Sequence, residues 1–167
     1  MGANPKTTAF LKECLADALI RLLETKPMEK ITIPAIAALA GVGRTTYFRN
    51  FSSKEEMLSF KLMLLWERWA EEHGVEVKRR YSADNALTFF QFNHSIRALL
   101  TLMYSRDLQS ALYKAFHIYM MPSDGADPLE CYQSSFYSYG LFGLLDAWIV
   151  RGFCETPEEM AEIGKAI

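Results

Sequence analysis

The side chains best suited to contact a polyanion lie in and around one seven-residue run, Arg44 to Asn50. They are Thr32, Arg44, Thr45, Thr46, Tyr47, Arg49, Asn50 and Lys54. Arginine can offer two parallel donors to guanine, asparagine can pair with adenine, and threonine can contact a thymine methyl group or a phosphate. Lys54 is expected to begin a helix, where the helix dipole also favours a phosphate. Together these residue types indicate a DNA contact surface.

Catalytic and metal-binding side chains show no comparable grouping. The histidines and cysteines are His73, His94, His117, Cys14, Cys131 and Cys154, and no two have metal-ligand spacing. No nucleophile–base pair, paired carboxylates or phosphate loop is evident. We therefore predict that the protein is not an enzyme, has no catalytic residues, and binds neither a metal nor a cofactor. The odd cysteine number, the lack of a signal-peptide pattern and the short apolar runs predict a cytoplasmic protein with reduced thiols and no membrane span.

The elements that must position these side chains are predicted to be helices. Apolar residues recur at spacings of three and four, and no segment alternates as a strand does. About nine helices are expected, over residues 8–25, 33–40, 44–50, 54–78, 82–93, 95–104, 107–121, 128–152 and from 157 onward. Suitable N-caps are Thr32, Ser53, Ser82 and Thr156. The predicted fold class is therefore all-α.

Residues 31–54, ITIPAIAALAGVGRTTYFRNFSSK, have the pattern of a helix-turn-helix. The two short helices are joined by three residues that include Gly41, which can adopt the positive φ of a tight turn. The expected core between them comprises Ile33, Ile36, Ala37 and Val42. The second helix is expected to turn Phe48 and Phe51 inward and to expose Tyr47. A helix of this composition suits the major groove of DNA.

The same stretch resembles the N-terminal domain of TetR-family transcriptional regulators. The matching positions are Ile31, Thr32, Ile36, Ala37, Ala40, Gly41, Val42, Thr46, Phe51 and Lys54, and the resemblance covers about residues 8–65. Family members commonly carry an aliphatic residue or phenylalanine and then tyrosine in the second helix, whereas here Tyr47 precedes Phe48. The hydroxyl that often touches a phosphate is therefore missing from position 48. Asn50 stands where histidine or tyrosine is frequent.

The resemblance implies two domains. The first, residues 1–53, is an N-terminal three-helix DNA-binding domain, and the second, residues 54–167, is a helical dimerisation and effector-binding domain. The charge distribution fits this division, since residues 1–60 carry a balance of +2 and the remainder −4. A homodimer would place two recognition helices in successive major grooves of a palindromic operator in double-stranded DNA.

The expected dimer interface lies near the C-terminus. The segment from Tyr137 to Trp148, followed by Arg151 and Gly152, is similar to the C-terminal region of the TetR subgroup that includes regulators of the dihydroxyacetone kinase operon. Small residues on one helical face would allow two helices to approach closely. The candidate interface residues are Phe136, Gly140, Gly143, Leu144, Ala147 and Trp148. The alternative is that these residues fill the core of a single chain.

An effector site, which the resemblance also implies, should lie between helices of the C-terminal half. The candidate ligand-binding residues are Phe89, Phe92, Tyr104, Tyr113, Phe116, His117, Met120 and Tyr139, with Tyr119 and Tyr132 as further aromatic surface. Such a lining suits a small apolar or aromatic effector held by a few hydrogen bonds. The alternative is that this aromatic stripe is ordinary core and that His117 is an ordinary histidine.

The function predicted from these features is a sequence-specific DNA-binding transcriptional regulator. It is expected to be a dimeric repressor released by an effector that tilts the helix predicted over residues 54–78 and changes the spacing of the two DNA-reading heads. Two alternatives remain. One is an enzyme, for which the sequence offers no site. The other is a helical protein-interaction module with a helix-turn-helix that does not bind DNA, which the Tyr47–Phe48 order and the net charge of −2 keep open.

Overall fold

The computed structural model describes residues 5–76, 86–122 and 125–167, and these residues form nine α-helices, one short 3-10 helix and no strand. In chain order the elements are α1 (Pro5–Thr25), η1 (Met28–Lys30), α2 (Ile33–Ala40), α3 (Arg44–Asn50), α4 (Lys54–Glu72), α5 (Ala86–Ser95), α6 (Arg97–Tyr104), α7 (Gln109–Met120), α8 (Pro128–Val150) and α9 (Pro157–Ala166). The predicted all-α fold is confirmed. None of the helices in these ranges has the length and hydrophobicity needed to cross a membrane.

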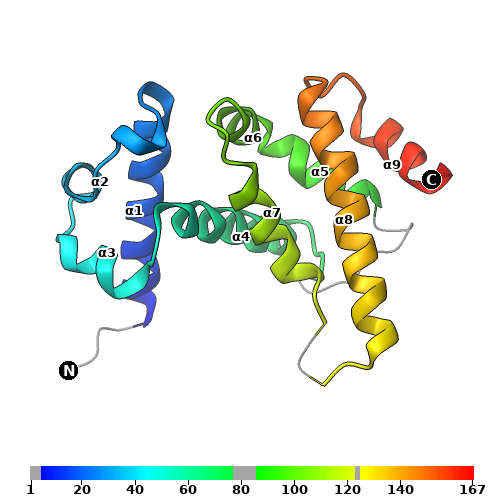
Figure 1. The fold of residues 1–167 in the computed structure, drawn as a ribbon, viewed down its shortest axis with the longest axis horizontal. Helices are drawn as coiled ribbons and strands as arrows, with labels where there is room; N and C mark the ends of the chain where they lie inside the picture. The colour runs from blue at the N-terminus through cyan, green and yellow to red at the C-terminus, as the bar shows by residue number, and fades with distance from the viewer. Residues whose placement is uncertain (1–4, 77–85, 123–124) are drawn as a thin grey trace.

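Helices α1 to α3 form one end of the molecule, which we call the head (Figure 1). Helix α1 packs against α2, α3 and α4, and its apolar face buries Leu15 and Leu19 against Ile36 and other core residues. Helix α2 begins where the Thr32 hydroxyl accepts a hydrogen bond from the Ala35 amide at 3.3 Å. It ends at Gly41, whose φ of +68° permits the sharp turn into α3.

Helices α5 to α9 form the body at the other end (Figure 1). There α5 packs on α9, α7 on α8, and α6 on α8. The long α8 begins at an Asp127 cap, whose carboxylate accepts from the Glu130 amide at 2.9 Å. Helix α9 begins with a capping box, in which the Thr156 hydroxyl accepts from the Glu159 amide and the Glu159 carboxylate accepts from the Thr156 amide.

Helix α4 connects the two ends, because it packs on α1 in the head and on α7 in the body. The Lys61 ammonium of α4 lies 2.8 Å from a carboxylate oxygen of Glu13 and 2.8 Å from one of Asp17, both on α1. The Arg68 guanidinium donates two hydrogen bonds to Glu13. These cations, Arg68 first and then Lys61, lower the pKa of Glu13 to about 2 against the opposing effect of burial. The head is therefore held to α4 by a charge network as well as by apolar packing.

A second link joins the body directly to the end of α1. The Arg106 guanidinium, in the turn between α6 and α7, donates to the carbonyl oxygens of Leu23 at 2.8 Å and Glu24 at 3.1 Å. These carbonyls belong to the last turn of α1, where a helix leaves its carbonyl groups without helical partners and where a positive charge is favourable. On the body side, the Ser59 hydroxyl of α4 donates to the Ala111 carbonyl of α7 at 2.9 Å. A displacement of α4, or of the turn that follows α6, would therefore change the contacts that hold the head.

The helix expected over residues 54–78 differs from the observed α4. It ends at Glu72, and Gly74 follows with a φ of +64°. A glycine in this conformation is a common helix terminator, and the expected helix ran past it. The rest of the expected helix beyond Glu76 and the proposed cap Ser82 lie outside the described residues. The Ser53 cap is confirmed, because its hydroxyl accepts from the Glu56 amide at 3.1 Å.

Candidate DNA-binding surface and effector cavity

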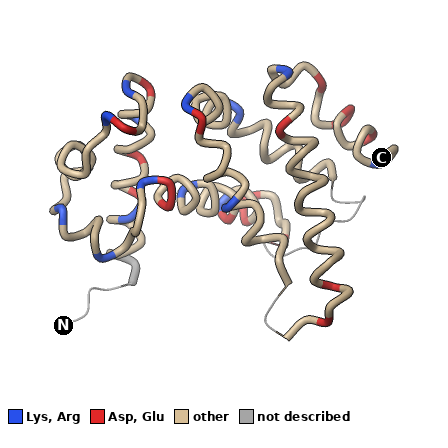
Figure 2. The backbone as a smooth tube through the Cα atoms, viewed as in Figure 1, with Lys and Arg blue, Asp and Glu red and all other residues tan. Residues whose placement is uncertain are grey.

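Four residues of α3 are exposed at the surface of the head: Arg44, Thr45, Phe48 and Arg49. Residues 31–54 contain three positively charged side chains and no Asp or Glu. Figure 2 shows this as Lys and Arg segments on α3 without an acidic segment on α2 or α3. An acid-free helix face that presents arginine and threonine is electrostatically matched to a nucleic-acid backbone.

The expected orientation of Tyr47 and Phe48 is wrong. The Tyr47 side chain is 6% exposed, and the Phe48 side chain is 70% exposed. Tyr47 is buried because it lies four residues before Phe51, about one helical turn, so both side chains face the inside of the head. Their ring centroids lie 6.3 Å apart, and the Phe51 ring continues the cluster to Phe60 at 5.8 Å. Tyr47 is therefore a core residue of the head in this structure.

Lys54 and Asn50 are half-buried, and each forms hydrogen bonds within the head. The Lys54 ammonium donates to the carbonyl oxygens of Met28 at 2.5 Å and Ile31 at 2.9 Å. It thus ties the start of α4 to η1 and the chain entering α2. The Asn50 amide donates to the Thr46 carbonyl of its own helix at 2.7 Å. Thr32 remains exposed while it caps α2, so its hydroxyl can accept from the Ala35 amide and still donate its O–H to a phosphate oxygen.

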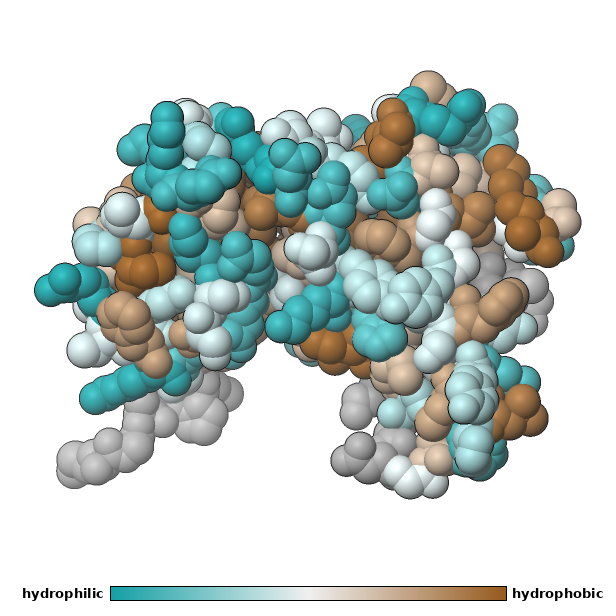
Figure 3. All heavy atoms as spheres, in the orientation of Figure 1, coloured by the Kyte–Doolittle hydropathy of each residue, from teal (hydrophilic) through white to brown (hydrophobic). Residues whose placement is uncertain are grey.

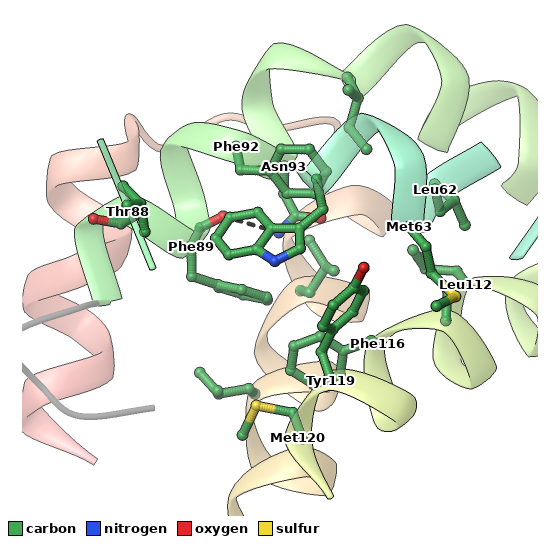
Figure 4. Close-up of a pocket in the computed structure, with 16 residues that line it drawn as sticks. Leu62, Met63, Thr88, Phe89, Phe92, Asn93, Leu112, Phe116, Tyr119 and Met120 are labelled. Atoms are coloured by element: carbon green, nitrogen blue, oxygen red, sulfur yellow. Dashed lines mark hydrogen bonds between the residues drawn. The ribbon is translucent and has the colours of Figure 1, made fainter. Parts of the chain in front are cut away.

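A cavity of about 110 Å³ lies between α4, α5, α7 and α8. Its lining residues are Leu62, Met63, Trp66, Val75, Thr88, Phe89, Phe92, Asn93, Ile96, Leu112, Ala115, Phe116, Tyr119, Met120, Leu141 and Leu145. Figure 4 shows the α5 side chains and the α7 side chains facing one another across it. The Asn93 amide is already used within α5, where it donates to the Phe89 carbonyl at 2.9 Å. None of these lining residues carries a charge.

Four of the eight predicted ligand-binding residues line this cavity: Phe89, Phe92, Phe116 and Met120. Tyr119, which the sequence indicated as further aromatic surface, lines it as well. The Tyr119 hydroxyl donates to Glu67 at 2.9 Å, and burial, followed by this bond, raises its pKa. The wall that α4 supplies was not predicted, because the apolar stripe of a helix does not reveal which of its residues border a void.

The other four predicted residues lie elsewhere. The Tyr104 hydroxyl donates to Asp146 at 2.7 Å across the α6–α8 contact, and burial together with this bond raises the pKa of Tyr104. Tyr113, His117 and Tyr139 form a cluster between α7 and α8, with the Tyr113 and Tyr139 rings stacked at 5.2 Å. His117 Nδ1 lies 3.2 Å from the Tyr113 hydroxyl and 3.2 Å from the buried Ser138 hydroxyl. None of these four lines the cavity.

The predicted interface residues divide into two groups. Phe136 is 73% exposed, and Gly140, Gly143 and Ala147 are exposed as well, while Leu144 is half-buried. Trp148 is 1% exposed, so its expected place in a dimer interface is wrong. Its ring packs in the body core against other aromatic rings, and its indole N–H donates to the Glu155 carbonyl at 3.1 Å.

A row of large apolar side chains is exposed along α8. It comprises Leu129, Tyr132, Phe136, Tyr139 and Val150, and Ile163 of α9 is exposed beside the same end of the molecule. Hydrophobic side chains are visible on the edge of the space-filling view where α8 and α9 lie (Figure 3). Exposed apolar side chains aligned along one helix in this way are typical of a protein–protein interface.

Comparison with known proteins adds independent evidence. Residues 15–59 match the family model of bacterial regulatory proteins of the tetR family. Residues 81–167 match the family model of a transcriptional regulator C-terminal region. No curated protein matches the chain. Within the described ranges, no group of three or more His, Cys, Asp or Glu side chains is placed to hold a metal ion.

Proposed function

Because the chain belongs to the TetR family of DNA-binding transcriptional regulators, we propose that it is a homodimeric, cytoplasmic and non-enzymatic repressor that a small-molecule effector releases from a palindromic operator. The observation that carries this proposal is the acid-free helix-turn-helix with an exposed α3 face. We place the boundary between its DNA-binding and regulatory parts at residues 53 and 54. The similarity of Tyr137–Trp148 to dihydroxyacetone kinase operon regulators supports an assignment to that subgroup.

Arg44, Thr45 and Arg49 are the polar residues proposed to contact DNA directly. All three are exposed on α3. Arg44 supplies a bidentate donor for guanine, and Arg49 adds positive charge at the other end of the short helix. Thr32 is exposed at the N-cap of α2 and Thr46 is half-buried on α3, and we propose that both add contacts beside this face. We propose that three other residues stabilise the head through internal contacts and do not bind DNA directly: Tyr47, Asn50 and Lys54.

The proposed dimer forms through the apolar row of α8 together with α9. The exposed positions of Gly140 and Gly143 support this, because a Cβ built on either glycine meets no atom within 4 Å, which leaves space for a second backbone to approach. A two-fold symmetric pairing repeats the same patch on both protomers. It also sets the separation of the two α3 helices, which must match two half-sites at once.

The proposed effector is a small, uncharged and largely apolar molecule bound in the cavity. An apolar cavity of roughly 150 Å³ can hold benzene, so the observed 110 Å³ limits the ligand to at most about one ring, and a larger ligand requires lining side chains to move aside. A charged ligand would bury its charge among uncharged residues at a large cost. Thr88, Asn93 and the Tyr119 hydroxyl are polar groups among the lining residues that can orient it.

Helix α4 provides the route from the effector to the head. Its residues Leu62, Met63 and Trp66 line the cavity, and Lys61, one residue before Leu62, holds Glu13 and Asp17 of α1. An effector that binds better when α4 is displaced will shift the population towards a dimer whose heads no longer match the operator. The effector acts only through this difference in affinity between the two states.

Selection of bound DNA from a random pool tests the proposal. We expect a palindromic consensus that the wild-type protein binds with an affinity that falls as salt rises. Arg44→Ala should weaken binding at one position of each half-site, by about 1–3 kcal/mol for the removal of a bidentate pair of hydrogen bonds, with an unchanged circular dichroism spectrum. Failure to enrich any sequence would favour a helical protein-interaction module instead.

A further inference from the structure

The order of Tyr47 and Phe48 gives α3 an unusual surface. Because Tyr47 faces the core, Phe48 presents its ring to solvent between polar neighbours. The two rings meet edge to face, with centroids 5.2 Å apart and an interplanar angle of 82°. Tyr47 is anchored in turn against Phe51. The exposed ring of Phe48 is therefore supported from beneath by a buried aromatic cluster, which restricts the positions it can take.

Phe48 lies within the surface proposed to face DNA. Arg44 and Thr45 precede it by four and three residues, so they share its side of the helix, and Arg49 follows it. All three are exposed. Of the four exposed residues of α3, a helix described along its whole length, Phe48 alone lacks a hydrogen-bonding group. Any molecule that covers this face must place an apolar group against the ring or leave a polar group beside it unpaired.

The chemistry of the major groove offers one apolar partner at base edges. The other groups that bases display there are hydrogen-bond donors and acceptors, whereas thymine carries a C5-methyl group that phenylalanine can contact. A phenyl ring cannot hydrogen-bond a phosphate, and it would displace water from phosphate oxygens without replacing the hydrogen bonds that the water made. A thymine methyl group is therefore the partner that matches Phe48 best.

We propose that Phe48 contacts the C5-methyl group of a thymine in each operator half-site and is a specificity-determining residue of this protein. This inference rests on the proposed DNA-binding function. The ring would recognise the base through an apolar contact, without any contribution from charge. Loss of the ring should lower affinity for thymine at that position and leave the dependence of affinity on salt nearly unchanged.

The test replaces individual thymines of the selected consensus by deoxyuridine, which lacks only the C5-methyl group, symmetrically in both half-sites. For the wild-type protein we expect one position at which the replacement weakens binding about fifteenfold, because each of the two methyl groups, one on each protomer, contributes about fourfold when it is buried. Phe48→Ala should bind the thymine operator more weakly and should no longer distinguish thymine from uracil there. Phe48→Leu, which keeps an apolar side chain, should retain part of the discrimination.

Phe10→Ala is the matched control, because Phe10 is a similarly exposed phenylalanine on α1 of the same head. It should keep the full sensitivity to uracil. If the wild-type protein binds its operator but Phe48→Ala and Phe48→Leu keep that sensitivity unchanged at every position, Phe48 does not read a thymine and the inference fails while the proposed function stands. If the wild-type protein binds no DNA specifically, both fail.

Discussion

Replacing Lys54 with methionine should destabilise the head and leave the salt dependence of DNA binding almost unchanged. Lys54 is the first residue of α4, where the helix dipole disfavours a cation. Its ammonium is compensated by the carbonyl oxygens of Met28 and Ile31. The methionine side chain keeps most of the apolar stem and removes the charge, so it isolates the contribution of these two bonds.

The size of the effect follows from the two hydrogen bonds. A hydrogen bond to a charged group contributes about 1.5–3 kcal/mol. The Met28 carbonyl still accepts from the Ile31 amide at 3.2 Å after the substitution, and the site is only partly buried, so the two contributions do not add in full. We expect a decrease of about 2 kcal/mol in the free energy of unfolding, equivalent to roughly 4–8 °C in Tm for a chain of this size.

Two measurements separate this account from a phosphate-binding role for Lys54. Urea denaturation gives the change in stability, with the exposed Lys30→Met as the control that should change it little. Anisotropy of labelled operator DNA against salt, measured where both variants are folded, gives the number of phosphates that the protein neutralises. A phosphate-binding Lys54 would reduce the slope of log Kd against log salt by about 1 for each phosphate that the variant no longer binds. An unchanged Tm with a shallower slope would refute our assignment.

Three further predictions concern the charge network and α8. Glu13→Gln should lower the free energy of unfolding by about 1–2 kcal/mol at neutral pH. It should also flatten the pH dependence of stability, because the pKa of Glu13 is lowered from 4.5 to about 2. The wild-type carboxylate therefore stabilises the fold above pH 4.5, and that contribution disappears as the pH falls towards 2. Parallel urea-denaturation profiles for wild type and variant across this range would contradict the assignment. Trp148→Ala should lower the free energy of unfolding by about 3–5 kcal/mol through loss of core packing. Phe136→Asp, in contrast, should yield folded monomers in sedimentation velocity. A dimer that survives Phe136→Asp would exclude this face of α8 as the dimer interface.

The head shows which features local sequence can predict. Helices α2 and α3 begin and end at the predicted residues, because Thr32 and Gly41 act through bonds within a few residues of themselves. The orientation of Tyr47 and Phe48 was predicted wrongly, although the four-residue spacing of Tyr47 and Phe51 places both on one face of the helix. Residue type alone does not distinguish two aromatic neighbours, and the packing of α3 against α1 and α2 buries the face that carries Tyr47.

The body shows the same limit on a larger scale. The aromatic residues of α7 were recognised, but they lie on two faces of that helix. Phe116 and Met120 line the cavity, whereas Tyr113 and His117 turn towards α8. Only the packing of α4 and α5 decides which face borders the void. Trp66 of α4 lines the cavity, but the sequence shows only that it belongs to the apolar stripe of its helix.

The central claim, that α3 of a symmetric dimer reads DNA, is tested most directly by sequencing the DNA that the purified protein selects from a random pool. We predict a palindrome whose half-site centres lie about 10 base pairs or a multiple of a helical turn apart, bound more weakly as salt rises. A pool that stays random after repeated selection, or binding that ignores salt and Arg44→Ala alike, would contradict the account.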